Sequence, residues 1–172
     1  MAESESLFSD SRTLFLLTMP IKESYEKALR RAVASAPYYQ LLKITLEEID
    51  VGFTRFRMPF RKELTQAYGV VHGGAIATLA DTAVAFAMMT MIQPGEKVVT
   101  VEFKINFLAP VSEGQMIGEA RVINKGKRLA LADMEVKTAE GKPIAKGLAT
   151  YIILSPPKGE KKRGLPRQAP GR

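Results

Sequence analysis

Residues able to do chemistry gather in one apolar stretch of the chain, Val70 to Ile92. Asp81 is the only carboxylate in this stretch, which also holds the only histidine of the chain, His72, followed by the glycines Gly73 and Gly74. A carboxylate that is buried loses its hydration, which is costly unless the protein supplies a partner or a wet cleft. We therefore predict that Asp81 is the centre of an active site, where a carboxylate can act as a base or a nucleophile.

The composition excludes several other kinds of site. The chain has no cysteine, so it has no disulfide, no cysteine metal ligand and no cysteine nucleophile, and its single histidine excludes multi-histidine metal sites. Acidic residues precede the short apolar run 14–17, whereas a secretory signal has a basic leader. We expect a cytoplasmic protein, and the absence of cysteine fits a reducing compartment.

The apolar stretch is long enough to suggest a membrane span, but its sequence favours a buried helix. The segment 75–92 is rich in alanine and has Asp81 within it. A carboxylate at the centre of a bilayer costs about 2.5–3.5 kcal/mol on insertion. We therefore expect no membrane partner.

The net charge of +7 is concentrated in the C-terminal tail, residues 156–172. This tail has six basic residues and one acidic residue, so it carries +5 of the total and leaves the body of the protein nearly neutral. A segment rich in Pro, Gly and Lys cannot bury enough apolar surface to order itself. We interpret it as a disordered tail rather than a phosphate-binding segment, and we expect no nucleic-acid partner.

The order of hydrophobic patterns predicts two helices, a strand region, one long helix and further strands. Apolar residues at three- and four-residue spacing predict a helix over residues 20–36, and a short helix over 38–42 follows. An alternating pattern then predicts a strand in which Phe56, Met58 and Phe60 share one face. After the long helix come four strand-like runs: 98–108, 115–124, 129–138 and 144–154.

An antiparallel sheet with the long helix against its concave face satisfies this order and belongs to the α+β class. The connections between the last four strands contain proline or glycine, as short turns do. A helix that is apolar on nearly every side must be covered on nearly every side. The sheet can cover only one side, so we expect a second subunit to cover much of the rest.

Three runs of the sequence resemble hotdog-fold acyl-CoA thioesterases of the phenylacetate-degradation type: Gly69–Ala83, Val101–Pro110 and Ala145–Tyr151. The resemblance is specific because His-Gly-Gly is combined with an aspartate nine residues after the histidine and with a later strand ending in Ala-Pro. It implies a hotdog fold, in which an antiparallel sheet is wrapped around a long central helix, here with an extra N-terminal helix. The chain then divides into an N-terminal arm and helix (1–36), a hotdog thioesterase domain (37–155) and the basic tail.

The resemblance also implies an activity and an assembly. Such proteins hydrolyse acyl-CoA thioesters without a metal or organic cofactor, as homodimers that often pair into homotetramers. For this chain we expect an aryl or a medium- to long-chain acyl group. The alternative is a non-catalytic acyl-CoA-binding sensor, and a hotdog dehydratase ranks last because only one histidine is present.

Site residues are carried over by position. Asp81 corresponds to the catalytic carboxylate, the backbone N–H of Gly73 to the oxyanion donor, and His72 to a residue that positions the thioester. Thr100 matches a hydroxyl that can assist the attacking water. Gln66 stands where many relatives have asparagine, which puts its orienting hydrogen bond in doubt.

Four residues are expected to contact the substrate in other ways. Gly74 continues the glycine turn beside the thioester, and the remaining three form a basic turn that could bind the phosphates of coenzyme A: Lys125, Lys127 and Arg128. A solvated hairpin end is the alternative interpretation of this turn.

The spacing of Gly73 and Asp81 bears on the oligomeric state. Thioester hydrolysis needs a base or nucleophile near the carbonyl carbon and a donor near the carbonyl oxygen, and a helix N-terminus supplies free N–H groups. The two residues are eight positions apart, or about 12 Å along one helix, so they cannot both touch one carbonyl. If both act, each site combines Gly73 of one subunit with Asp81 of another. Whether Asp81 acts as general base or as nucleophile stays open.

Overall fold

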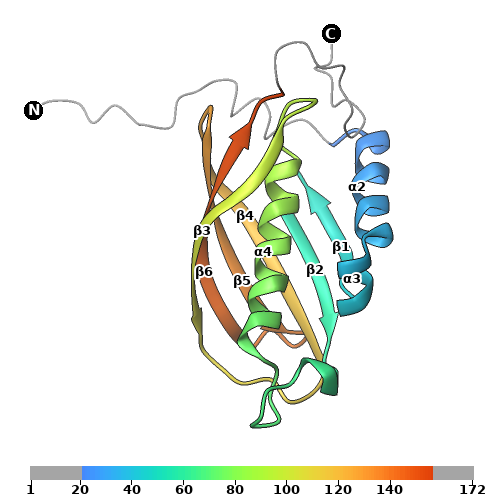
Figure 1. Cartoon of the computed structure of the whole chain (residues 1–172), viewed down its shortest axis with the longest axis vertical. Coiled ribbons are helices and arrows are strands. Elements are labelled where there is room, and N and C mark those ends of the chain that lie inside the picture. Colours follow the sequence, from blue (N-terminus) through green and yellow to red (C-terminus); the bar gives the residue numbers. More distant parts are fainter. Residues whose placement is uncertain (1–20, 157–172) are drawn as a thin grey trace, which may run out of the picture.

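The computed structural model describes residues 21–156 (Figure 1). The predicted N-terminal arm and nearly all of the predicted disordered tail lie outside these residues. The helices are α2 (Glu23–Ser35), α3 (Pro37–Leu42), the short 3-10 helix η1 (Lys62–Leu64) and α4 (Gly73–Met89). The strands are β1 (Thr45–Asp50), β2 (Phe53–Pro59), β3 (Lys97–Phe107), β4 (Gln115–Lys125), β5 (Leu129–Thr138) and β6 (Pro143–Leu154).

The six strands form one sheet in the order β1-β2-β4-β5-β6-β3, and every neighbouring pair is antiparallel. The sheet curves around α4, whereas α2 and α3 lie beside β1 at one edge (Figure 1). The other edge is β3. The predicted sheet around a long helix is therefore confirmed, and the four later strands match their predicted ranges to within one or two residues.

Helix α4 is held in place by the core of the sheet. Its residue Leu79 is fully buried, as are Phe56 and Met58 on the inner face of β2. Gly118 on β4 faces Leu79, and a Cβ at this glycine would lie 2.7 Å from Leu79 Cγ. Helix and sheet thus approach closely because β4 has no side chain at the point of contact. The predicted inner face of β2 is confirmed except at Phe60, which lies after the strand end and is only half-buried.

The opposite face of β2 carries the arginines, as the alternation predicts. Arg55 donates hydrogen bonds to Glu119 on β4 at 2.6 Å and to Glu48 on β1 at 2.7 Å. Lys137 on β5 donates to the second oxygen of Glu119 at 2.7 Å. These contacts form an ion cluster across four strands of the outer face.

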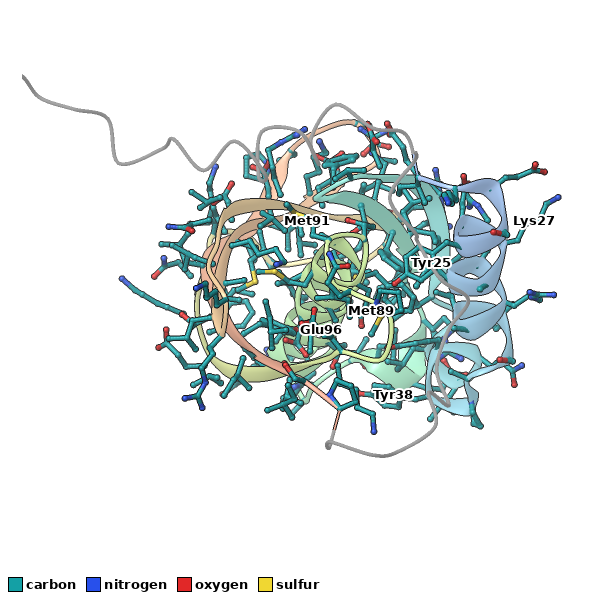
Figure 2. The ribbon with its side chains drawn as sticks, turned by 90° about the horizontal axis from the view of Figure 1, so that it is seen from above. Tyr25, Lys27, Tyr38, Met89, Met91 and Glu96 are labelled. Carbon is teal, nitrogen blue, oxygen red and sulfur yellow. The ribbon has the colours of Figure 1, made fainter. Side chains whose placement is uncertain are left out.

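The extra N-terminal helix packs against the end of α4. Tyr25, Leu29 and Val33 of α2 are buried at four-residue spacing, and the Tyr25 hydroxyl donates to the Met89 carbonyl oxygen at 2.7 Å. Figure 2, seen along α4, shows Tyr25 between α2 and Met89 while Lys27 projects outward. Helix α2 therefore covers apolar surface and satisfies a carbonyl at the C-terminus of α4. Helix α3 begins at Pro37, one residue earlier than expected, since proline suits the first helical position.

One stripe of α4 is left uncovered by the sheet. Gly74, Thr78, Asp81, Ala85 and Met89 are each exposed or half-buried, whereas the residues facing the sheet are buried. Their spacing of three and four residues places them along one side of the helix. The sheet therefore covers only part of α4, as expected. Because the helix is apolar on nearly every side, the uncovered stripe calls for a further partner. In the described part of the chain no helix is long and apolar enough to cross a membrane.

Candidate active site

A pocket of about 360 Å³ lies at the N-terminus of α4. Its lining comes from the loop before the helix, from the first turn of the helix and from the end of β3: Gln66, Val70, Gly73, Ile76, Phe107 and Pro110. Gln66 is fixed in its loop by two backbone hydrogen bonds, its N–H donating to Val70 and its carbonyl accepting from Gly69. The sequence-predicted residues Gln66 and Gly73 are thus brought together.

The backbone N–H groups at the start of α4 are nearly all used. The Gly74 N–H donates to Nδ1 of His72 at 2.8 Å, and the N–H groups of Ala75 and Ile76 donate to the His72 carbonyl oxygen at 2.9 and 3.4 Å. Within residues 21–156, the Gly73 N–H has no acceptor. The helix start therefore offers one free donor beside the pocket, where the helix dipole also favours negative charge.

His72 is the N-cap of α4. Because its Nδ1 accepts the Gly74 N–H, this nitrogen is unprotonated in the neutral ring and Nε2 carries the hydrogen. A Cβ at Gly74 would lie 3.0 Å from Nδ1, so glycine at this position leaves room for the capping ring. The capping bond thus orients the imidazole at the N-terminus of α4, and the lack of a side chain at Gly74 makes room for this cap.

Gly73 also lets an aromatic ring pack against the helix start. A Cβ at Gly73 would lie 3.1 Å from Cζ of Phe107, at the end of β3. The close approach that glycine allows at position 73 is therefore used in part by the Phe107 ring of the same chain.

Asp81 lies two turns further along α4 and is held by two hydroxyl groups. Its Oδ1 accepts from the Tyr151 hydroxyl of β6 at 2.5 Å and from Thr100 Oγ1 of β3 at 3.0 Å. Thr100 and Tyr151 are direct partners in the pairing of β3 with β6. Burial and the hydrogen bond to Asp81 raise the pKa of the Tyr151 phenol, so it remains a protonated donor.

A β-bulge adjoins this cluster. The pairing of β3 with β6 shifts between Thr100 and Glu102, so that Val101 is the extra residue. A bulge locally redirects side chains and increases twist. Here it separates Thr100, which contacts Asp81, from Glu102, which accepts a hydrogen bond from Thr150.

Comparison with known proteins identifies the family. Residues 68–145 match the Thioesterase superfamily. The chain is 34% identical over 110 residues to acyl-coenzyme A thioesterase 13 of Pongo abelii, matching 63% of this chain and 78% of that protein. This chain belongs to the hotdog thioesterases. Its predicted fold class and its assignment as a thioester hydrolase are thereby confirmed, and the sensor and dehydratase alternatives fall away.

Two further proteins resemble this thioesterase. The proofreading thioesterase EntH of Klebsiella pneumoniae is 31% identical over 101 residues, which are 59% of this chain and 74% of that protein. A solved structure of a thioesterase family protein from Silicibacter pomeroyi is 30% identical, with a TM-score of 0.71, and the match covers 76% of this chain and 98% of that chain.

The predicted site residues of this thioesterase fall into two groups within one chain. Gln66, His72 and Gly73 lie at the N-terminus of α4, whereas Asp81 and Thr100 form the second group. Helix α4 is unbroken between the groups, so the rise of about 12 Å from Gly73 to Asp81 applies. Sequence reasoning found members of both groups and anticipated their separation.

The basic turn lies at the opposite end of the thioesterase from the pocket. It joins β4 to β5, and Leu129 at the start of β5 pairs with Ile152 near the end of β6. The C-terminus of α4 lies at this end, as Figure 1 shows. The three basic residues are therefore far from Gly73 of their own chain.

Sequence reasoning missed the tyrosines around Asp81. Burial and the charge of Asp81 raise the pKa of Tyr39 on α3, and the hydroxyl of Tyr38 lies 3.2 Å from Thr78 Oγ1 on the uncovered stripe. Tyr151 belongs to a sequence run that marked the family, but its contact with Asp81 spans seventy positions along the chain. Only the strand register could have revealed it. Among residues 21–156, no cluster of three His, Asp or Glu side chains is placed to hold a metal ion.

Proposed function

We propose that this thioesterase hydrolyses acyl-CoA thioesters carrying aryl or medium- to long-chain acyl groups, at sites shared between two subunits. One observation carries the proposal. The free N–H of Gly73 and the half-exposed carboxylate of Asp81 lie on one straight helix about 12 Å apart. Each is half of a site for acyl transfer, and a second copy supplies the missing half.

The free edge of the sheet supports such a pairing. Strand β3 has a neighbour only on one side within the described chain. It is eleven residues long and exposes large apolar side chains at 38% to 56% of their surface: Val99, Val101, Phe103 and Phe107. Long apolar edges are normally paired or covered. A second copy related by a two-fold axis would cover β3 and the uncovered stripe of α4, with two equivalent sites per dimer.

In the general-base route, Asp81 takes a proton from water as the water oxygen bonds to the thioester carbonyl carbon. The carbonyl π electrons move to its oxygen, where the Gly73 N–H of the other subunit stabilises the negative charge. When that oxygen re-forms the double bond, the carbon–sulfur bond breaks and the coenzyme A thiolate leaves, taking up the proton. In the nucleophilic route, a carboxylate oxygen of Asp81 attacks the carbon itself, and the carbon–sulfur bond breaks to release the coenzyme A thiolate and leave a mixed anhydride. Water then hydrolyses the anhydride to the free acid and the Asp81 carboxylate, and a proton from this water goes to the thiolate.

The first experiment measures release of free thiol from phenylacetyl-, benzoyl- and straight-chain acyl-CoA thioesters, with Asp81→Ala beside the wild type. We expect turnover by the wild type and its loss in a folded Asp81→Ala protein. Hydrolysis that persists in the variant would refute the role of Asp81. A single turnover in oxygen-18 water tests the nucleophilic route, because label enters the Asp81 carboxylate only when Asp81 has attacked the substrate and water has then attacked the aspartyl carbon of the anhydride.

Mixed dimers test whether sites are shared. Subunits with Gly73→Pro are mixed with subunits carrying Asp81→Ala, each inactive alone. Random pairing makes half of the dimers mixed, and each mixed dimer has one intact site of two, so about a quarter of the wild-type activity should return. Activity that stays at the level of the separate variants would contradict a shared site.

The basic turn is our candidate for the coenzyme A phosphates. All three of its basic residues belong to the hairpin between β4 and β5, and the structure describes no ion pair for any of them: Lys125, Lys127 and Arg128. Unpaired cations near a site attract phosphate groups in a salt-dependent way. Because α4 helices would run antiparallel in the dimer, the hairpin of one subunit lies toward the Gly73 end of the other. Replacing all three residues by Ala should raise KM for acyl-CoA and leave KM for a short pantetheine thioester unchanged.

A further inference from the structure

We propose that Tyr151 is a positioning residue for thioester hydrolysis, which together with Thr100 holds Oδ1 of Asp81 and leaves Oδ2 as the oxygen that reacts. The inference rests on the proposed catalytic role of Asp81. It adds a residue outside the predicted site and assigns the reactive atom.

The two oxygens of Asp81 have different surroundings. Oδ1 accepts the Tyr151 hydroxyl at 2.5 Å and Thr100 Oγ1 at 3.0 Å. Across residues 21–156, Oδ2 accepts no hydrogen bond. Asp81 is half-buried, and Oδ2 is not among the buried side-chain atoms without a partner, so solvent can reach it. Water or substrate can therefore approach Oδ2, whereas Oδ1 already accepts two hydrogen bonds.

The donors are anchored more firmly than the carboxylate. Tyr151 is 1% exposed and lies on β6, which is paired on both sides, with β5 and with β3. Its hydroxyl also lies 3.0 Å from the Asp81 backbone oxygen, so the phenol is fixed relative to α4. Thr100 is its direct partner on β3, immediately before the bulge. A carboxylate held by such groups is confined to one rotamer, which is what a base or nucleophile about 3 Å from its target requires.

Protonation keeps this arrangement intact over the working pH range. Burial and the Asp81 carboxylate raise the pKa of Tyr151, so the phenol does not ionise there. Among residues 21–156, Tyr39 on α3 is a second titratable group facing Asp81, and its pKa is also raised. Thr100, which contacts Asp81 from β3, does not titrate. The two hydroxyl donors to Oδ1 therefore keep their hydrogens over this pH range.

The hydroxyls stabilise the charged carboxylate, and Oδ2 performs the step. In the base route Oδ2 accepts the water proton while the new carbon–oxygen bond forms, and the hydrogen bonds at Oδ1 remain in place. In the nucleophilic route Oδ2 forms the bond to the carbonyl carbon. Tyr151 neither gains nor loses a proton in either route.

Tyr151→Phe tests the inference, with Tyr25→Phe as matched control. Both changes delete one buried phenol hydroxyl that bonds to α4, but Tyr25 donates to the Met89 carbonyl and not to Asp81. We expect Tyr151→Phe to lower kcat about ten- to a hundredfold with little change in KM, the usual range for loss of a hydrogen bond to a charged group. Tyr25→Phe should keep both kcat and KM.

The outcomes separate the inference from the proposed function. Turnover that persists in Asp81→Ala overturns the proposed function and this inference with it. An inactive Asp81→Ala beside a folded Tyr151→Phe with a kcat within twofold of wild type overturns the inference alone. A loss of thermal stability in both tyrosine variants without a change in kcat would show a structural role only, which also overturns it.

A second variant keeps the test decisive if Tyr151→Phe fails to fold. Thr100→Val removes the other donor to Oδ1 at a half-buried position. We expect kcat to fall with little change in KM, and to fall less than in Tyr151→Phe, because the longer of the two hydrogen bonds is lost. A kcat within twofold of wild type would overturn the assignment of Oδ1 as the held oxygen.

Discussion

Replacing Gly73 by proline is the sharpest test of the oxyanion donor. Proline has no backbone N–H, and it is well tolerated at the first residue of a helix, which is the position of Gly73. The preceding residue, His72, has φ −63° and ψ 135°, an extended conformation that is compatible with a following proline. The helix should therefore form without the N–H donor.

The expected magnitude follows from the hydrogen-bond inventory of the helix start. Because the next three N–H groups donate to His72, no neighbouring backbone donor can replace that of Gly73. Loss of a single oxyanion donor typically lowers kcat about 100- to 1000-fold, or about 2.7–4 kcal/mol. We expect a loss in this range.

Gly73→Ala is the matched control. Alanine introduces the same Cβ, which meets the Phe107 ring at 3.1 Å, but it keeps the N–H. The ratio of kcat between the alanine and proline variants therefore isolates the donor. Because proline also places its Cδ where the hydrogen was, KM must stay within a few-fold of the alanine variant for the loss to count as catalytic. A proline variant with kcat within tenfold of the alanine variant would refute the oxyanion role.

Three further predictions concern the fold. Gly147→Ala should lower the free energy of unfolding, measured by chemical denaturation, by about 3 kcal/mol or more. Its Cβ would lie 2.1 Å from the Lys104 backbone oxygen on β3, so β3 and β6 would have to move apart. Burial alone would raise the pKa of Glu119, but hydrogen bonds from its two basic partners lower it overall. The stabilisation from the ionised Glu119 is thus fully present above about pH 4.3, the pKa of a glutamate in the unfolded chain. It is lost as the pH falls through the lower pKa of Glu119 in the folded protein. Glu119→Gln should therefore make the free energy of unfolding fall less steeply as the pH is lowered. Leu29→Ala should cost about 2–5 kcal/mol without changing acyl-chain preference, whereas a changed preference would show that α2 also shapes the pocket.

Much of the fold follows from local signals in the sequence. His72 before two glycines marks the start of α4, Pro37 starts α3, and the alternation around Phe56 identifies the inner face of β2. These signals act over a few residues, so they can be interpreted without knowing the fold. Alternation alone also places Phe60 on this face, because the pattern continues past the point where β2 ends.

The predicted catalytic residues stand where local signals placed them, but their partners do not follow from such signals. A lone carboxylate in an apolar helix predicts a site because its burial is costly. The donor at Gly73 follows from the general deficit of acceptors at a helix start, whereas the finding that only this N–H is free depends on the capping geometry of His72.

The sequence by itself determined the order of the helices and strands, the apolar character of α4, and the presence of Asp81 and Gly73 on that helix eight residues apart. Only the tertiary structure decided which hydroxyls hold Asp81, because Tyr151 is seventy positions away and reaches it through the register of β3 with β6 and the bulge after Thr100. A shift of one residue in that register would turn the hydroxyl of the displaced strand to the outer face, away from Asp81. Such pairing is a property of the assembled sheet, in which the burial of many side chains together selects one alignment.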